Sequence, residues 1–211
     1  MSKDRITLML CVIALGEKYK PLIIGKSANP RAFKQAGVNI KQFSVIYRSN
    51  KKAWMNSNLF EEYITELNRS VKLQNRKILL FLDNCGPHIN LKRSNVKLLF
   101  LPPNTISRLQ PLDMGIIQTF KIYYRKQMLQ FLVSKAESVM CASEFTQAVN
   151  VLDAIRWSIT AYNNISKETI VKCFANAGIK DSSFTRDNEA RFLSVEMPTC
   201  DPILECIPVL G

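Results

Sequence analysis

Long apolar runs are absent from this sequence of 211 residues. The longest apolar-rich stretch runs from Ile6 to Leu15 and is well short of the roughly 18 to 20 residues that cross a bilayer. Asp4 and Arg5 precede it, and it carries no small-residue cleavage site, so we interpret it as a buried strand and not as a signal peptide. The sequence therefore predicts a soluble intracellular protein without membrane attachment.

Metal-binding and disulfide patterns are also missing. The chain has six cysteines with no C-x-x-C pair and a single histidine, His88, which excludes zinc-finger spacing. A disulfide between Cys200 and Cys206 is disfavoured in a reducing compartment, so we expect the cysteines to be small core or surface residues. With 47% hydrophobic residues and only seven glycines, the composition excludes disordered and fibrous proteins and fits one domain with a core.

Positive charge is abundant and unevenly distributed. The net charge is +12, yet residues 1–135 carry 23 basic and 7 acidic side chains, whereas residues 136–211 carry 6 basic and 10 acidic ones. A basic body of this kind favours a phosphate-backbone partner, most simply DNA. The alternative is a solvated surface that serves solubility.

The apolar pattern predicts an α/β sheet layered with helices. Residues 25–41 read as a loop, and residues 181–211 as a loosely held tail. We expect the strand at 19–24 to be peripheral because it contains Pro21, and the uninterrupted apolar strand at 78–82 to be central. The predicted strands are residues 6–14, 19–24, 43–48, 78–82 and 96–101. Four helices are predicted: one that starts at a cap at Asn56 or Ser57, two that cover residues 113–135 and 145–162, and one that runs from a cap at Ser166 to a stop at Gly178.

Two carboxylates stand at the ends of predicted elements. Asp83 directly follows the strand at 78–82, and Asp113 comes thirty positions later at the start of a helix. Paired carboxylates suit Mg²⁺, which prefers oxygen ligands and serves phosphoryl transfer. The alternative is that both are ordinary turn or cap residues.

Two segments carry a resemblance to a known family. They are "LLFLDNCGPH", which contains Asp83, and "VKLLFLPPNTISRLQPLDMGIIQTFKIYYR", which contains Asp113. Together with the segments around them, over roughly residues 2–180, they resemble the endonuclease domain of Tigger/pogo-type transposases, a group that includes jerky-like and centromere protein B-like proteins.

The resemblance implies a ribonuclease H-like mixed sheet flanked by helices, with three acids that bind two Mg²⁺ ions. Asp83 matches the second acid and Asp113 the third, with Asn84, Cys85 and His88 as neighbours of the second and Gln110 and Pro111 as neighbours of the third. Gly86 departs from the family, which commonly has proline at that point of the turn, so the turn geometry is expected to differ.

The first acid of the family lies on a strand upstream of residues 6–14, and Asp4 does not match it. We therefore expect the first strand and the first acid to be missing, with residues 1–135 as a partial endonuclease domain, 136–180 as its C-terminal helices and 181–211 as the tail. The expected protein is a nuclear DNA-binding protein that does not cleave. The alternatives are a Mg²⁺-dependent endonuclease whose first acid lies upstream, and a protein-interaction remnant without DNA binding.

Several basic residues flank the acidic pair in sequence and are candidates for contacts with the DNA backbone. Arg125 and Lys126 follow Asp113 on the same predicted helix, and for each cation alone a solvated position is the alternative. Phe120, Tyr123 and Tyr124 on that helix are expected to pack in the core and not to stack on bases. The candidate DNA-binding residues are Lys92, Arg93, Arg108, Lys121, Arg125 and Lys126.

Overall fold

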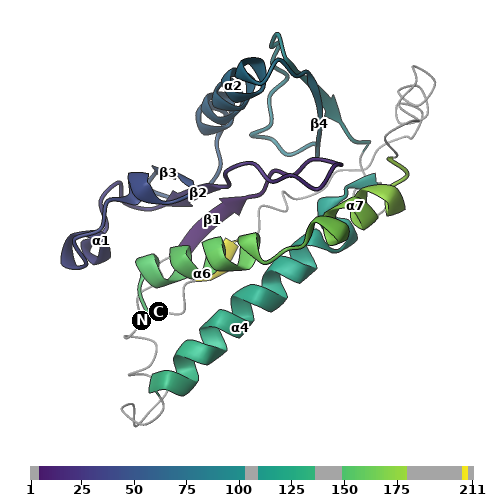
Figure 1. The fold of residues 1–211 in the computed structure, drawn as a ribbon. Coiled ribbons are helices and arrows are strands. Elements are labelled where there is room, and N and C mark those ends of the chain that lie inside the picture. Colours follow the sequence, from purple (N-terminus) through teal and green to yellow (C-terminus); the bar gives the residue numbers. More distant parts are fainter. Residues whose placement is uncertain (1–4, 103–108, 136–148, 180–205, 209–211) are drawn as a thin grey trace.

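The computed structural model describes residues 5–102, 109–135, 149–179 and 206–208. They form a mixed α/β arrangement in which helices cover a four-stranded sheet and a separate two-stranded sheet lies on its other side (Figure 1). The larger sheet has the order β3-β2-β1-β6, with β1 antiparallel to β2 and β6 and with β2 parallel to β3. Its strands are β1 (Arg5–Met9), β2 (Leu22–Gly25), β3 (Ile46–Ser49) and β6 (Cys206–Pro208).

The smaller sheet consists of β4 (Ile78–Leu82) and β5 (Val96–Phe100), which pair in parallel from Ile78 opposite Val96 to Leu82 opposite Phe100. The apolar run at 78–82 therefore forms a strand as predicted. Its expected central place is not found, because within the described residues β4 pairs only with β5 and most of its side chains are half-buried.

Two strand predictions need correction. The strand predicted at 6–14 ends at Met9, because the chain then bends into a turn in which Val12 bridges to Lys18. The strand predicted at 19–24 starts at Leu22 and is fully buried between β1 and β3, so it is not peripheral. Pro21 lies before the strand, so its missing backbone N–H does not interrupt the hydrogen bonds of β2. The reason for expecting an edge position therefore does not apply.

The region predicted as a loop, residues 25–41, contains the short helix α1 (Arg31–Gln35), and a 3₁₀ turn follows at Ile40–Gln42. A five-residue helix gives little periodicity, and here the buried side chain of Phe33 fixes it by packing edge-on against Tyr47 of β3, with ring centroids 5.4 Å apart. The loop prediction is therefore wrong for these residues.

The longer helices follow the predicted caps. Asn56 caps α2 (Ser57–Leu73) by accepting a hydrogen bond from the backbone of Leu59, and Ser166 caps α7 (Lys167–Asn176) in the same way through Thr169. Gly178 follows α7 with φ of +78°, as a helix stop requires. The remaining helices are α4 (Ile117–Lys135) and α6 (Val151–Asn163), and the predicted helical residues 145–148 lie outside the described residues.

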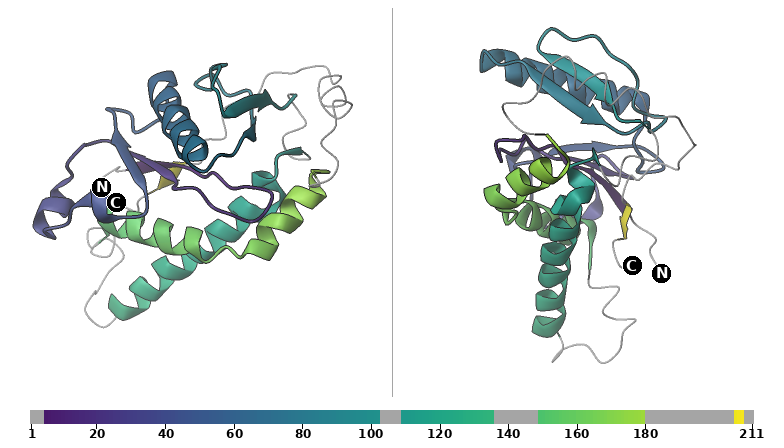
Figure 2. Two further views of the ribbon diagram at one scale, coloured as in Figure 1. Left: turned by 45° about the horizontal axis from the view of Figure 1, so that its top comes forward. Right: turned by 90° about the vertical axis from the view of Figure 1, so that its right-hand side faces the viewer.

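The apolar core divides into two clusters on the two faces of the larger sheet. Ile23 of β2 packs with α4, α6 and α7, whereas its neighbours Leu22 and Ile24 pack with α2 and the smaller sheet. This alternation follows from the two-residue period of a strand that is buried on both faces. Figure 2 shows the resulting layers, with α2, β4 and β5 on one side of β1 and β2 and with α4 and α6 on the other.

Three of the cysteines, Cys11, Cys85 and Cys173, are buried free thiols, as expected of small core residues. None of the described helices is long and apolar enough to span a membrane. Most of the predicted tail at 181–211 lies outside the described residues.

Candidate functional site

Asp83 lies at the carboxyl end of β4, where the apolar strand stops. The residue is 8% exposed, which is low for a carboxylate. The next residue, Asn84, turns its side chain the other way and donates a hydrogen bond from Nδ2 to the carbonyl oxygen of Leu101, 3.0 Å away. Because Leu101 directly follows β5, this bond ties together the ends of the two parallel strands and fixes the start of the turn.

The turn after Asp83 folds His88 back onto it. The backbone N–H of His88 donates to the carbonyl of Cys85 at 2.8 Å, which closes a four-residue turn around Gly86 and Pro87. As a result, Nδ1 of His88 lies 2.6 Å from Oδ1 of Asp83 and 3.3 Å from the backbone oxygen of Asp83. A side chain at Gly86 would meet no atom within 4 Å, so the glycine is not required by crowding.

Both side chains of this pair retain an unused polar atom. Oδ1 of Asp83 and Nε2 of His88 are buried and have no aligned hydrogen-bond partner among the described residues, despite the short contact between the side chains. Buried polar atoms in this condition are uncommon in folded proteins and frequently mark a place where a water, an ion or a ligand binds.

Asp113 comes from the other side of the sheet. It lies in a wide helical turn, Leu112–Ile116, which starts where the backbone N–H groups of Asp113 and Met114 both donate to the carbonyl of Gln110. Gly115 has φ of +137°, a conformation that a residue with a side chain rarely adopts, and it separates this turn from α4. The glycine thus allows Asp113 to be placed independently of the long helix.

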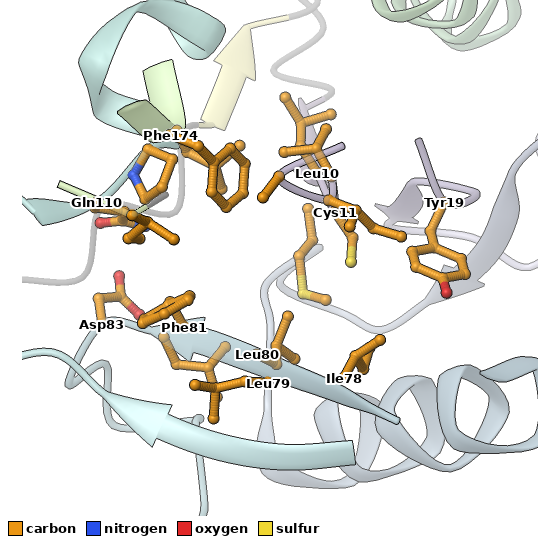
Figure 3. Close-up of a pocket in the computed structure, with 18 of the residues that line it drawn as sticks. Leu10, Cys11, Tyr19, Ile78, Leu79, Leu80, Phe81, Asp83, Gln110 and Phe174 are labelled. Atoms are coloured by element: carbon orange, nitrogen blue, oxygen red, sulfur yellow. The ribbon is translucent and has the colours of Figure 1, made fainter. Parts of the chain in front are cut away.

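The two predicted acids line the same cavity. It has a volume of about 360 Å³, and its lining includes the segment that continues β1 and all five residues of β4. Figure 3 shows Asp83 and Gln110 at one end of the cavity and Tyr19 and Ile78 at the other, with apolar side chains such as Leu80 between them. His88, Pro111 and Asp113 belong to the lining as well. Of the predicted neighbours of the two acids, Asn84 and Cys85 are not part of the lining, and Asn84 bonds to Leu101 instead.

The chemistry of the donors suits a hard cation in part. Asp83 and Asp113 both line the cavity, and carboxylate oxygens are the ligands that a hard cation prefers. No group of three or more His, Cys, Asp or Glu side chains able to hold a metal ion occurs among the described residues. The described part of the site therefore supplies two carboxylates, and binding of Mg²⁺ stays a prediction.

The thiol next to the carboxylate is unreactive. Burial, together with the smaller effect of the negative charge of Asp83, raises the pKa of Cys85 to about 11. A thiol with so high a pKa is almost entirely protonated at neutral pH, so Cys85 is neither a nucleophile nor a thiolate ligand in this state.

The candidate DNA-binding cations fall into two groups on different layers. Arg125 and Lys126 are exposed on α4, and Lys121 on the same helix is half-buried. Lys92 is exposed ahead of β5, whereas Arg93 donates to Glu61 at 2.9 Å and to Thr65 at 3.2 Å, so its charge is partly neutralised. Arg108 lies outside the described residues.

The aromatic residues of α4 pack as expected. Phe120 and Tyr124 are buried, and Tyr124 contacts Trp157 of α6 edge-on with centroids 5.9 Å apart. Tyr123 is half-buried and packs against the same cluster, so the interpretation of these rings as core residues is confirmed.

Sequence reasoning missed two residues that shape the site. Phe60 of α2 lies against the ring of His88, with centroids 4.6 Å apart, and Gly115 sets the placement of Asp113. The helical spacing of Phe60 predicts only that it is buried, because its partner depends on how the turn after β4 folds. Gly115 follows Asp113 by two residues inside a predicted helix, and a glycine at such a position indicates a possible break in the helix.

These features define a mixed α/β domain in which carboxylates from different elements share one cavity beside the end of parallel strands. Residues 3–174 match the family model described as "DDE superfamily endonuclease". The match covers more than half of the chain, and the chain belongs to this family.

Relatives among characterised proteins agree with this assignment. The chain is 34% identical over 189 residues to the mouse Tigger transposable element-derived protein 4, a match that covers 89% of this chain and 35% of the relative. It is 32% identical to CENP-B homolog protein 2 and to ARS-binding protein 1 of Schizosaccharomyces pombe, with 84% of this chain covered in each case. The chain thus spans about a third of the length of these relatives, and no solved structure matches it significantly.

Proposed function

We propose that this chain is part of a transposase-derived nuclear protein that binds DNA through its basic body and that does not cleave DNA with Asp83 and Asp113 alone. Support for DNA as the partner comes from the 23 basic and 7 acidic residues of positions 1–135, and from a relative that is named for binding ARS. The family membership supports the origin from a transposase.

The carrying observation is that Asp83 and Asp113 line one cavity whose described lining contains no third carboxylate. When bound there by Asp83 and Asp113, Mg²⁺ would activate an attacking oxygen and stabilise a leaving one. Phosphoryl transfer of this kind uses two metal ions that must be positioned together. Loss of one of the three carboxylates that bind them therefore lowers the rate by orders of magnitude.

We further propose a ribonuclease H-like sheet in which one more strand fits between β1 and β4 and carries the remaining acid. The cavity is lined by the segment that continues β1 and by the whole of β4, and the described part of β6 pairs with β1 only from Arg5 to Thr7. An additional strand would join the two sheets and fill the apolar part of the cavity. This arrangement favours the second candidate function, a Mg²⁺-dependent DNA endonuclease that is complete only when that strand is present.

A third candidate, a protein-interaction remnant, has one observation in its favour. Ile122, Leu129 and Val133 are large apolar residues of α4 with exposed fractions of 58%, 55% and 74%, and their spacing places them along one side of the helix. An exposed apolar stripe of this kind suits contact with another protein.

One set of assays separates the three functions. The chain and its Asp83→Asn variant are titrated onto duplex DNA at several salt concentrations and are then incubated with supercoiled plasmid and Mg²⁺ or Mn²⁺. The proposal expects salt-dependent binding by both proteins and no nicking by either. Nicking that disappears in Asp83→Asn would establish the endonuclease, and an absence of salt-dependent DNA binding would leave the interaction remnant.

A further inference from the structure

We infer that His88 is a positioning residue for Asp83: its imidazole holds the Asp83 carboxylate in the orientation in which that group binds a divalent cation. The inference rests on the cation-binding role proposed for Asp83. It adds a residue that does not itself touch the cation and that acts through a carboxylate.

The geometry of the turn carries the argument. Nδ1 of His88 lies 2.6 Å from Oδ1 of Asp83, and the side chains are only 9% and 12% exposed, respectively. The contact is therefore mostly shielded from bulk water, and the imidazole is well placed to set which way the carboxylate faces. A carboxylate that binds a cation through one oxygen is generally held by a hydrogen bond to the other, and such supporting partners are worth about tenfold to a hundredfold in metal affinity.

His88 is held in place through its backbone and through its ring. The backbone N–H of His88 donates to the carbonyl of Cys85, and the face of the imidazole packs against Phe60, which is fully buried on α2. These restraints leave the imidazole few alternatives to its position beside Asp83, which is the preorganisation that a supporting residue needs.

The alignment of the contact between His88 and Asp83, and not its length, limits the hydrogen bond between them. Oδ1 of Asp83 has no aligned donor among the described residues although Nδ1 of His88 is close by, so the contact is short but poorly directed. Hydrogen bonds at functional sites are commonly misaligned without ligand and tighten when it binds. A small rotation of the carboxylate would align Nδ1–H with Oδ1 and turn Oδ2 toward the cavity shared with Asp113.

A purely structural role for His88 is the competing explanation, because its ring also fills space against Phe60. Three variants separate the two roles. His88→Phe keeps an aromatic ring on Phe60 but has no donor, His88→Asn places an amide nitrogen close to the position of Nδ1, and His88→Gln places it close to the position of Nε2.

The test measures Mn²⁺ affinity of the full chain by electron paramagnetic resonance of the free ion, together with thermal unfolding in the absence of metal. Asp83→Asn is measured alongside as the reference for loss of the site. The inference expects His88→Phe and His88→Gln to weaken Mn²⁺ binding at least about tenfold, and His88→Asn to stay within about threefold of the unchanged protein.

The outcomes also distinguish the inference from the proposed function. If Asp83→Asn binds Mn²⁺ as tightly as the unchanged chain, Asp83 is not a cation ligand, and both ideas fail. If Asp83→Asn loses binding but His88→Phe and His88→Gln keep it, the cation site stands and the positioning role is wrong. Equal weakening in all three His88 variants, in parallel with their loss of thermal stability, would assign His88 to packing alone.

Discussion

Neutralising Arg125 and Lys126 together should reduce DNA affinity and its dependence on salt. Both side chains are exposed on α4, and neither forms an ion pair with another described residue that would have to break before it met a phosphate. The double variant Arg125→Ala, Lys126→Ala is therefore a direct test of whether α4 faces the DNA backbone.

The size of the effect follows from counterion release. Each phosphate contact contributes about 0.9 to the slope of log affinity against log salt concentration, so two lost contacts lower the slope by about 1.8. The ratio of the DNA affinity of the unchanged chain to that of the variant should therefore be about tenfold smaller at 200 mM salt than at 50 mM salt. Such a change is large compared with the error of a fluorescence anisotropy titration on a labelled duplex.

A matched control removes the same charge elsewhere. Arg31→Ala, Lys34→Ala neutralises two exposed cations of α1, a helix that packs against β3 and lies apart from α4 (Figures 1 and 2). We expect this control to keep the slope of the unchanged chain. A variant at 125 and 126 with an unaltered slope would refute the placement of α4, and an equal loss in the control would mean that only the overall charge matters.

Three further predictions concern stability and pH. Lys18→Met should lower the free energy of unfolding, measured by urea denaturation, by about 1 to 2 kcal/mol relative to the exposed control Lys20→Met. The reason is that Nζ of Lys18 donates to three carbonyls at the end of α6, at 2.8 to 3.0 Å. Asn56→Ala should cost about 1 kcal/mol through loss of the α2 cap, whereas Asn58→Ala, inside the same helix, should not destabilise in a thermal melt. Burial raises the pKa of Cys11 to about 11, so the folded state keeps a proton that the unfolded chain loses near pH 9, and stability should fall by up to about 1.4 kcal/mol per pH unit between these values. Cys11→Ala should show a shallower alkaline decline, and identical declines in the two proteins would contradict the assignment.

Local features of the fold were predictable from the sequence. The strand at 78–82 was located residue for residue because an uninterrupted apolar run is bounded there by polar residues. The caps at Asn56 and Ser166 were recognised because a side-chain acceptor before an apolar helical pattern has a local physical role. The family was likewise read from contiguous motifs, and the match over residues 3–174 confirms it.

Non-local features were not predictable in the same way. The place of β2 between β1 and β3 depends on pairing partners that no short window contains, and Pro21 suggested an edge position because its place before the strand could not be known. The contact between His88 and Asp83 depends on a turn whose closure is set by backbone geometry. That Asp83 and Asp113 share one cavity is a result of the fold, and their chemical roles stay predictions.

The division of the core into two clusters has a consequence for how ligands and stability are connected. Asp83 belongs to the layer of α2, β4 and β5, and Asp113 belongs to the layer of α4 and α7, with the cavity between them. A ligand held by both carboxylates would therefore connect the two layers, and its binding free energy would stabilise both of them against local opening. Native-state hydrogen exchange would then register binding far from the cavity, as slower exchange in whole helices of both layers and not only in the residues that touch the ligand.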